Sequence, residues 1–169
     1  MTTDGHAAYD GGVVQSTELL DRVRDAQHDL GTGDPADALE AVEPLLSATA
    51  DAVRGPGFLR ASPPERARLI EAFCYARVTA VLALEAVDAR QAVPRIRTLA
   101  GEALEVATPD NAAWKALCAA AEMLGRSGDA DGAVWAVEAA RRLVPQEDYV
   151  IQLRGSLRSM FPGAFAEPR

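Results

Sequence analysis

Two stretches of the chain repeat one local pattern, and this repeat constrains the fold more than any other feature. In each stretch a Gly-Asp pair precedes three apolar residues at intervals of four and then three: Gly33, Asp34, Ala38, Val42 and Leu45, and Gly128, Asp129, Ala133, Val137 and Ala140. Such intervals place side chains on one face of an α-helix. Glycine permits the left-handed conformation that ends one helix, and aspartate caps the next. The repeat therefore predicts helix pairs joined by tight turns, with a small residue where the helices approach.

Other capping signals extend this prediction along the chain. Residues 62–65 read SPPE, which is typical of a capping box with proline in the first turn, and Asp34 and Thr108 each precede a proline. Alanine and leucine are abundant and favour helix. Short connections join antiparallel helices, so the first six helices would form three hairpins and the seventh would cap the stack. We expect an all-α fold with helices over 16–31, 35–53, 63–89, 92–107, 110–126, 130–144 and 147–160.

These helices form one expected domain over residues 16–160. Residues 1–15 carry no periodic apolar pattern and are expected to be a flexible N-terminal arm, and residues 161–169 a C-terminal tail. The one long connection, 54–61, would display Phe58 and Leu59. The first helix of the middle hairpin carries two apolar stripes, which predicts that its neighbours bury it on two sides.

The composition narrows the classes of partner and the compartment. A net charge of −8 at pH 7 opposes nucleic acid, which needs a basic surface. No stretch approaches the ~20 apolar residues of a membrane span, and no leader pattern opens the chain, so no membrane partner is expected. Cys74 and Cys118 stand alone in apolar segments, which indicates buried reduced thiols in a cytoplasmic protein. Sixteen of the 17 basic residues are arginine, as in high-GC bacterial genomes.

No pattern in the sequence indicates catalysis, a cofactor or a metal. The Gly-Asp turns lack the strand and the lysine of a phosphate-binding loop, and neither histidine follows a glutamate by three residues, as in di-metal bundles. His28 has no serine or cysteine at helical spacing, and Asp25 and Asp29 indicate a solvated face. We therefore expect no catalytic residue, no cofactor and no metal site.

Residues 117–145 resemble one unit of the tetratricopeptide repeat. The matching positions, in the family's order, are Leu117, Ala120, Ala121, Leu124, Gly128, Asp129, Ala133, Val137, Ala140 and Pro145. Residues 19–46 match fairly well, but the hairpin between them lacks the Gly-Asp turn and has about 45 residues against the family's roughly 34. The resemblance implies a right-handed α-solenoid of three antiparallel helix hairpins plus a C-terminal capping helix. Its groove would bind a partner protein or peptide.

One ligand of that family is not implied here, namely a C-terminal carboxylate held by lysine, asparagine and arginine. The lysine and asparagine positions fall on Val23 and Gln27 in the first hairpin and on Cys118 and Glu122 in the third. The carboxylate of Glu122 would repel such a ligand.

Trp135 is the residue that the repeat does not use. It lies about 200° around its helix from Ala133, so it should point away from the paired helix. We expect the last helix and the tail to cover it through Phe161 or Phe165, and the alternative is an exposed anchor for a partner. Trp114 is expected to pack on the preceding hairpin and Lys115 to be solvated.

Four arginines surround the middle hairpin: Arg66, Arg77, Arg95 and Arg97. Salt-bridged surface arginines are expected here, in preference to a groove for an acidic peptide. The residues that could contact a partner in the groove or on the surface are Val23, Gln27, Arg77, Trp114, Lys115, Cys118, Glu122, Arg126 and Trp135.

The leading functional hypothesis is a non-enzymatic interaction module that binds a protein segment in its groove or forms a homodimer. Two alternatives remain open. A regulatory module that senses a small molecule or peptide would need a groove pocket containing His28 or Tyr75. A small helical enzyme would use a carboxylate such as Glu71 or Glu122, buried beside a cavity.

Overall fold

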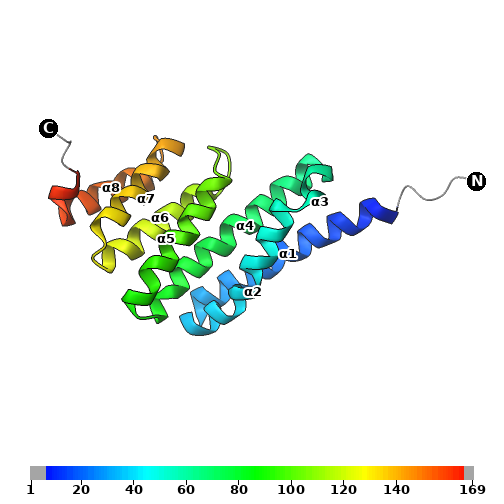
Figure 1. The fold of residues 1–169 in the computed structure, drawn as a ribbon, viewed down its shortest axis with the longest axis horizontal. Coiled ribbons are helices and arrows are strands. Elements are labelled where there is room, and N and C mark those ends of the chain that lie inside the picture. The colour runs from blue at the N-terminus through cyan, green and yellow to red at the C-terminus, as the bar shows by residue number, and fades with distance from the viewer. Residues whose placement is uncertain (1–6, 166–169) are drawn as a thin grey trace, which may run out of the picture.

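The chain is all-helical in the computed structural model, which describes residues 7–165 and the side chains of residues 15–165. In that range there is no strand, so the expectation of an all-α fold is confirmed. Figure 1 shows the helices following one another along the long axis of the molecule. The elements are α1 (Ala7–Thr32), α2 (Pro35–Arg54), α3 (Pro56–Arg60), α4 (Pro63–Ala83), the 3-10 turn η1 (Leu84–Ala86), α5 (Ala89–Glu105), α6 (Ala113–Arg126), α7 (Ala130–Leu143), α8 (Asp148–Met160) and the 3-10 turn η2 (Pro162–Phe165).

Each of the seven expected helices has a counterpart, and the differences lie at the ends. Helix α1 begins at Ala7, so residues 7–15 continue a helix where we expected a flexible arm. Extending an existing helix needs no new nucleus, and the sequence pattern did not account for this. Residues 1–6 of that arm and 166–169 of the expected tail lie outside the described residues. The connection after α2 contains the short helix α3, in which Leu59 is 79 % exposed as expected and Phe58 is partly buried.

The turn between α6 and α7 has the predicted geometry. Gly128 has φ +78°, and the amides of Gly128 and Asp129 donate to the carbonyls of Gly125 (3.1 Å) and Leu124 (2.9 Å). The carboxylate of Asp129 accepts from the amide of Gly132 at 3.2 Å and caps α7. Helix α7 ends at Leu143, shortly before Pro145.

The matching turn between α1 and α2 is capped but is not left-handed, so the prediction for Gly33 was wrong in that respect. Among the described residues Gly128 alone has positive φ. The amide of Gly33 instead continues the helical pattern by donating to the carbonyl of Asp29 at 2.8 Å. Asp34 accepts from the amide of Ala36 at 2.8 Å, which confirms its capping role. Capping at the start of a helix is therefore what the two turns share.

Helix α4 is central to the packing. It contacts α1 and α2 toward the N-terminal end of the molecule and α5 and α6 toward the other end (Figure 1), which confirms that neighbours bury it on two sides. Its start is the predicted capping box: the amide of Ser62 donates to Glu65 at 2.7 Å, and the amide of Glu65 donates to Ser62 at 3.4 Å.

The contact between α6 and α7 is lined by very small side chains. Ala133 and Ala140 are fully buried, as expected, and Ala38 is equally buried on α2. Gly125 on α6 is also buried, and a Cβ atom added there would lie 3.9 Å from Cβ of Ala133 and 2.8 Å from a methyl carbon of Leu157 on α8. Three helices therefore meet at this glycine with no room for a larger side chain.

Arg77 is not the surface arginine that the sequence suggested. Its side chain is 1 % exposed and lies inside the molecule between α2, α4 and α5. Its guanidinium donates to Glu102 on α5 and to Thr49 and the carbonyl of Leu46 on α2, and it stacks 3.4 Å from the ring centroid of Phe73. Partners that lie far away in the sequence supply these contacts, which is why the local pattern missed them.

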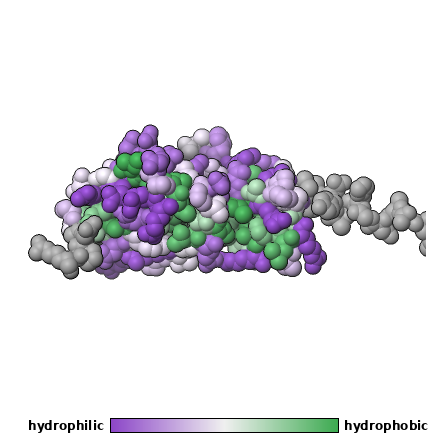
Figure 2. All heavy atoms as spheres, turned by 90° about the horizontal axis from the view of Figure 1, so that it is seen from above, coloured by the Kyte–Doolittle hydropathy of each residue, from purple (hydrophilic) through white to green (hydrophobic). Residues whose placement is uncertain are grey.

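The outer surface is mixed in character. Figure 2 shows hydrophilic residues over most of one face, with hydrophobic residues emerging between them in separate patches. None of the described helices combines the length and the hydropathy needed to cross a bilayer.

Candidate functional site

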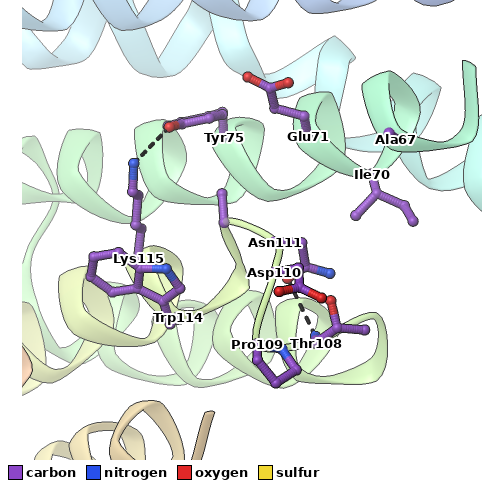
Figure 3. A pocket seen from close by; sticks show the side chains of 11 residues that line it. Ala67, Ile70, Glu71, Tyr75, Thr108, Pro109, Asp110, Asn111, Trp114 and Lys115 are labelled. Carbon is purple, nitrogen blue, oxygen red and sulfur yellow. Dashed lines mark hydrogen bonds between the residues drawn. The ribbon is translucent and has the colours of Figure 1, made fainter. Parts of the chain in front are cut away.

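An open cavity of about 590 Å³ lies between α4 and the start of α6, and we call it the α4–α6 groove. Figure 3 shows its walls: α4 forms one side, the first turn of α6 the other, and the preceding loop closes the base. At intervals of four, Ala67, Glu71 and Tyr75 share one face of α4. The residues that line the groove are Ala67, Ile70, Glu71, Tyr75, Thr108, Pro109, Asp110, Asn111, Ala112, Trp114 and Lys115.

Lys115 and Tyr75 meet across the groove. The ammonium of Lys115 donates to the hydroxyl oxygen of Tyr75 at 2.8 Å, and the two side chains point toward one another in Figure 3. The ammonium also lies 5.2 Å from the ring centroid of Tyr75 and 5.6 Å from that of Trp114, within the range of cation–π attraction. The two aromatic side chains therefore already lie beside one positive charge, which sits at the hydroxyl end of Tyr75 and not over its ring face.

The loop at the base of the groove is held by Asn111. Its side-chain amide donates to the carbonyl of Val106 at 2.7 Å, and its side-chain oxygen accepts from the amide of Ala113 at 3.1 Å. Helix α6 begins at Ala113, with Ala112 at its N-cap, so the predicted start at residue 110, signalled by Thr108, was placed too early. These contacts fix Trp114, in the first turn of α6, relative to the loop.

Carboxylates outnumber cations among the charged residues that line the groove. Glu71 accepts from Arg24 on α1 at a long 3.5 Å, and its side chain is 40 % exposed. Asp110 is exposed and makes no hydrogen bond or ion pair within residues 15–165. Lys115 is the only cation in this lining.

The arginines near the middle hairpin do not contribute to this groove. Arg95 pairs with Glu43, and Arg97 pairs with Asp129 at 2.6 Å, so the expectation of salt bridges is confirmed for these two. Arg66 donates to the carbonyl of Ala61 at 3.0 Å. With Arg77 buried, the alternative of an arginine-lined groove for an acidic peptide is wrong for this cavity.

The positions that correspond to the carboxylate clamp are not arranged as a binding site. Val23 and Cys118 are buried, and Gln27 is half-buried. The carboxylate of Glu122 accepts a short hydrogen bond from the hydroxyl of Tyr149 on α8, which joins α6 to α8. Arg126, on the last turn of α6, lies 4.0 Å from Glu122 and from Glu85.

The two cysteines are buried free thiols, as expected. The pKa of Cys74 and of Cys118 is raised to about 12, mainly because burial disfavours the thiolate, and the neighbouring carboxylates Glu71 and Glu122 contribute to the increase. A thiol is a nucleophile only as its thiolate, so neither side chain is activated for attack.

Trp135 is 37 % exposed. Phe161 and Phe165, which we expected to cover it, pack against the main apolar core, and more than a third of the Trp135 surface stays open. The helix that carries Trp135 is contacted by α8 and by η2, so the expected cover by the last helix and the tail is incomplete at this residue. The last helix folds so that Leu157 and Phe161 reach Gly125 instead.

The residues named for the two alternative functions, a sensor and an enzyme, either lie outside the groove or are not deeply buried. His28 is exposed near the end of α1 and does not line the groove, whereas Tyr75 does. Of the two carboxylates suggested for an enzyme, Glu71 lines the groove with a partly exposed side chain, and Glu122 lies outside it. Within the described part of the chain, no three His, Cys, Asp or Glu residues are grouped closely enough to hold a metal ion.

Sequence reasoning found Trp114 and Lys115 but not the loop at 108–112 that completes the groove. One feature of the sequence could have indicated the wall that α4 contributes. Glu71 and Tyr75 are four residues apart, so they share a face of α4, and they lie outside its apolar stripes. Comparisons of this chain with protein-family models, with curated proteins and with solved structures found no match.

Proposed function

We propose that the chain is a non-enzymatic interaction module that binds an extended segment of a partner protein in the α4–α6 groove. We further propose that its helices form a tetratricopeptide-like, right-handed solenoid. The capped Gly128-Asp129 turn supports this architecture, as do the direct contacts of α1 with α4 and of α4 with α6, which join the first helices of successive hairpins.

The observation that carries the functional proposal is the lining of the groove. Tyr75 and Trp114 offer aromatic faces, Ile70 and Pro109 add apolar surface, and charged side chains stand at the rim. Aromatic anchors in a concave site are typical of surfaces that bind protein segments. Helices and a hydrogen-bonded loop hold these residues, so the site is preformed.

Site-specific photocrosslinking in an extract of the native cells tests this proposal. A photoreactive benzophenone amino acid replaces Ile70 in the groove, and in a matched variant it replaces the exposed Glu40 on α2. We expect a partner to be captured from position 70 and not from position 40, because only the first lies in the groove. Capture of nothing from position 70, or the same products from both positions, would contradict the proposal.

A second candidate function is the sensing of a small molecule, and the position of Tyr75 in the cavity favours it. The volume of about 590 Å³ falls in the range of small-molecule sites, roughly 300–1,000 Å³. A metabolite present at 100 times its Kd would stabilise the fold by about 2.7 kcal/mol and raise Tm by roughly 5–11 °C for a chain of this length. A metabolite screen by thermal shift in which wild type and Trp114→Ala respond alike would argue against this function.

The buried free thiols support a further proposal, that the protein works in the reducing cytoplasm of a bacterium. A homodimer is the other mode of association that we propose, and the partly exposed Trp135 would be available for it. Sedimentation of a monomer at high protein concentration would exclude the dimer.

A further inference from the structure

The charge of the α4–α6 groove points to the chemistry of its occupant. Glu71 and Asp110 are the two carboxylates of the lining, and Lys115 is its one cation. The whole chain has a net charge of −8, so the long-range field also attracts positive segments and repels negative ones. An acidic occupant would be repelled by the two carboxylates of the lining and by the net negative charge of the chain.

The aromatic faces of the groove suit a positive charge as well. The ammonium of Lys115 lies within 6 Å of the ring centroids of Tyr75 and Trp114. A guanidinium or an ammonium binds such faces by cation–π attraction, and its carbon stem packs on apolar surface such as that of Ile70. The groove therefore already holds one cation of the protein, hydrogen-bonded to the Tyr75 hydroxyl and near the ring of Trp114.

Two contacts within the protein at the groove can be replaced by contacts to a partner with little loss of stability. The hydrogen bond of Lys115 to Tyr75 is made by an exposed side chain with many rotamers. The pair of Arg24 with Glu71 is long, at 3.5 Å, and joins two side chains that are 57 % and 40 % exposed. Exposed ion pairs of this kind contribute little to stability. Glu71 is therefore able to accept a partner's cation in place of Arg24.

We propose that the segment bound in the α4–α6 groove is basic, with an arginine or lysine beside an apolar residue. Lys115 holds the cation position beside the Tyr75 hydroxyl and the Trp114 ring in the free protein and leaves it when the partner binds. This inference rests on the proposed function and names the class of partner.

A pair of charge-swapped peptides tests the inference. The background is Trp135→Phe, in which Trp114 is the only tryptophan and its fluorescence reports on the groove. The probes are acetyl-Leu-Arg-Leu-Arg-amide and acetyl-Leu-Glu-Leu-Glu-amide. We expect the basic peptide to change the emission of Trp114 in a saturable way, with a Kd that rises with salt because exposed charges are screened. The acidic peptide should leave the emission unchanged.

Charge variants then locate the contact. Glu71→Gln with Asp110→Asn should weaken binding of the basic peptide about threefold to thirtyfold, since each exposed pair contributes up to roughly fivefold. The matched control is Glu40→Gln with Glu85→Gln, two exposed carboxylates outside the lining, which lowers the negative charge by the same two units. The control should change Kd less than about twofold.

Lys115→Met distinguishes a basic from an acidic ligand, because it should strengthen binding of the first and weaken binding of the second. If Lys115 is the internal occupant, its removal should tighten binding of the basic peptide about twofold to fivefold, because an exposed like charge is removed. Binding of the acidic peptide to the wild type and its loss in Lys115→Met would overturn the inference and leave the proposed function standing. If neither peptide changes Trp114 at millimolar concentration, the inference is overturned, and the crosslinking from position 70 decides the proposed function separately.

Discussion

The buried pair of Arg77 and Glu102 allows one prediction to be worked out from the structure. The guanidinium of Arg77 is 1 % exposed, and the carboxylate side chain of Glu102 is 27 % exposed. Nε of Arg77 lies 2.9 Å and Nη2 2.8 Å from the same carboxylate oxygen of Glu102. Burial lowers the pKa of Arg77 and the hydrogen bond to Glu102 opposes this change, which indicates that the guanidinium depends on its partner.

Replacing Glu102 and replacing Arg77 should therefore lower the free energy of unfolding by different amounts. Glu102→Ala leaves the positive charge buried and uncompensated, which is expected to cost about 3–5 kcal/mol. Arg77→Met removes the buried charge and keeps most of the side-chain volume, and the remaining carboxylate recovers water. We expect this change to cost only about 1–2 kcal/mol for the lost hydrogen bonds.

The double variant sharpens the prediction. With both charges gone, no buried ion remains, so Arg77→Met with Glu102→Ala should be about 2 kcal/mol more stable than Glu102→Ala alone. Urea denaturation measures all four free energies of unfolding, and Tm should fall by roughly 6–20 °C in Glu102→Ala. As a control for the loss of a surface charge, Glu105→Ala breaks the exposed pair with Arg54 and should change stability by about 0–1 kcal/mol.

Two results would refute this reasoning. One is a larger loss in Arg77→Met than in Glu102→Ala, which would mean that the hydrogen bonds of Arg77 outweigh the penalty of a buried charge. The other is a double variant less stable than either single variant, which would mean that the two residues stabilise the fold independently.

Three further predictions concern the α6–α7 turn and the thiols. Asp129→Asn should cost about 1 kcal/mol at pH 7, because the hydrogen bond from its arginine partner holds the pKa of this carboxyl below its usual range. That stability is present above the ordinary aspartate pKa and is lost as pH falls through the lower folded pKa. The urea midpoints of variant and wild type should therefore converge as pH falls below about 4, and a constant difference would contradict this. Gly128→Ala should cost about 1–2 kcal/mol at its φ of +78°. By contrast, Gly31→Ala, in the last turn of α1 where a Cβ atom would meet open space, should stabilise by about 0.5 kcal/mol. Thermal melts that place both variants on the same side of wild type would be inconsistent with this. Burial raises the pKa of Cys74 and Cys118 to about 12, so a thiol reagent at pH 8 should label both in urea and neither in the native protein; rapid native labelling would show that a thiol is accessible.

The helices could be predicted from the sequence because their signals are local. The capping box at Ser62 and Glu65 and the caps at Asp34 and Asp129 each involve residues within three positions of one another. Local contacts of this kind form wherever the chain is helical, so they can be identified before the packing is known. The start of α6 was misplaced because Thr108 and the proline after it have the pattern of a helix start, whereas the helix begins at Ala113.

The groove and the buried arginine could not be predicted in the same way. Arg77 reaches Thr49 and Glu102, which lie 28 and 25 positions away in the sequence. Lys115 reaches Tyr75 across 40 positions. Which helical faces meet depends on the packing of the whole chain, and an arginine at a helical position has the same local pattern whether it faces solvent or a neighbouring helix. The partial exposure of Trp135 likewise depends on long-range packing, since α8 and η2 contact α7 but leave 37 % of this residue exposed.

The small side chains between α6 and α7 restrict how this protein can evolve. Gly125, Ala133 and Ala140 leave almost no volume between the helices, and Leu157 already fills the space beside the glycine. A methyl group added at Gly125 would force the side chain of Leu157 to move within a packed core, whereas the loss of one from an alanine leaves only a small void. Substitution at these positions is therefore restricted to the smallest side chains, while the exposed faces of the same helices remain open to almost any polar residue.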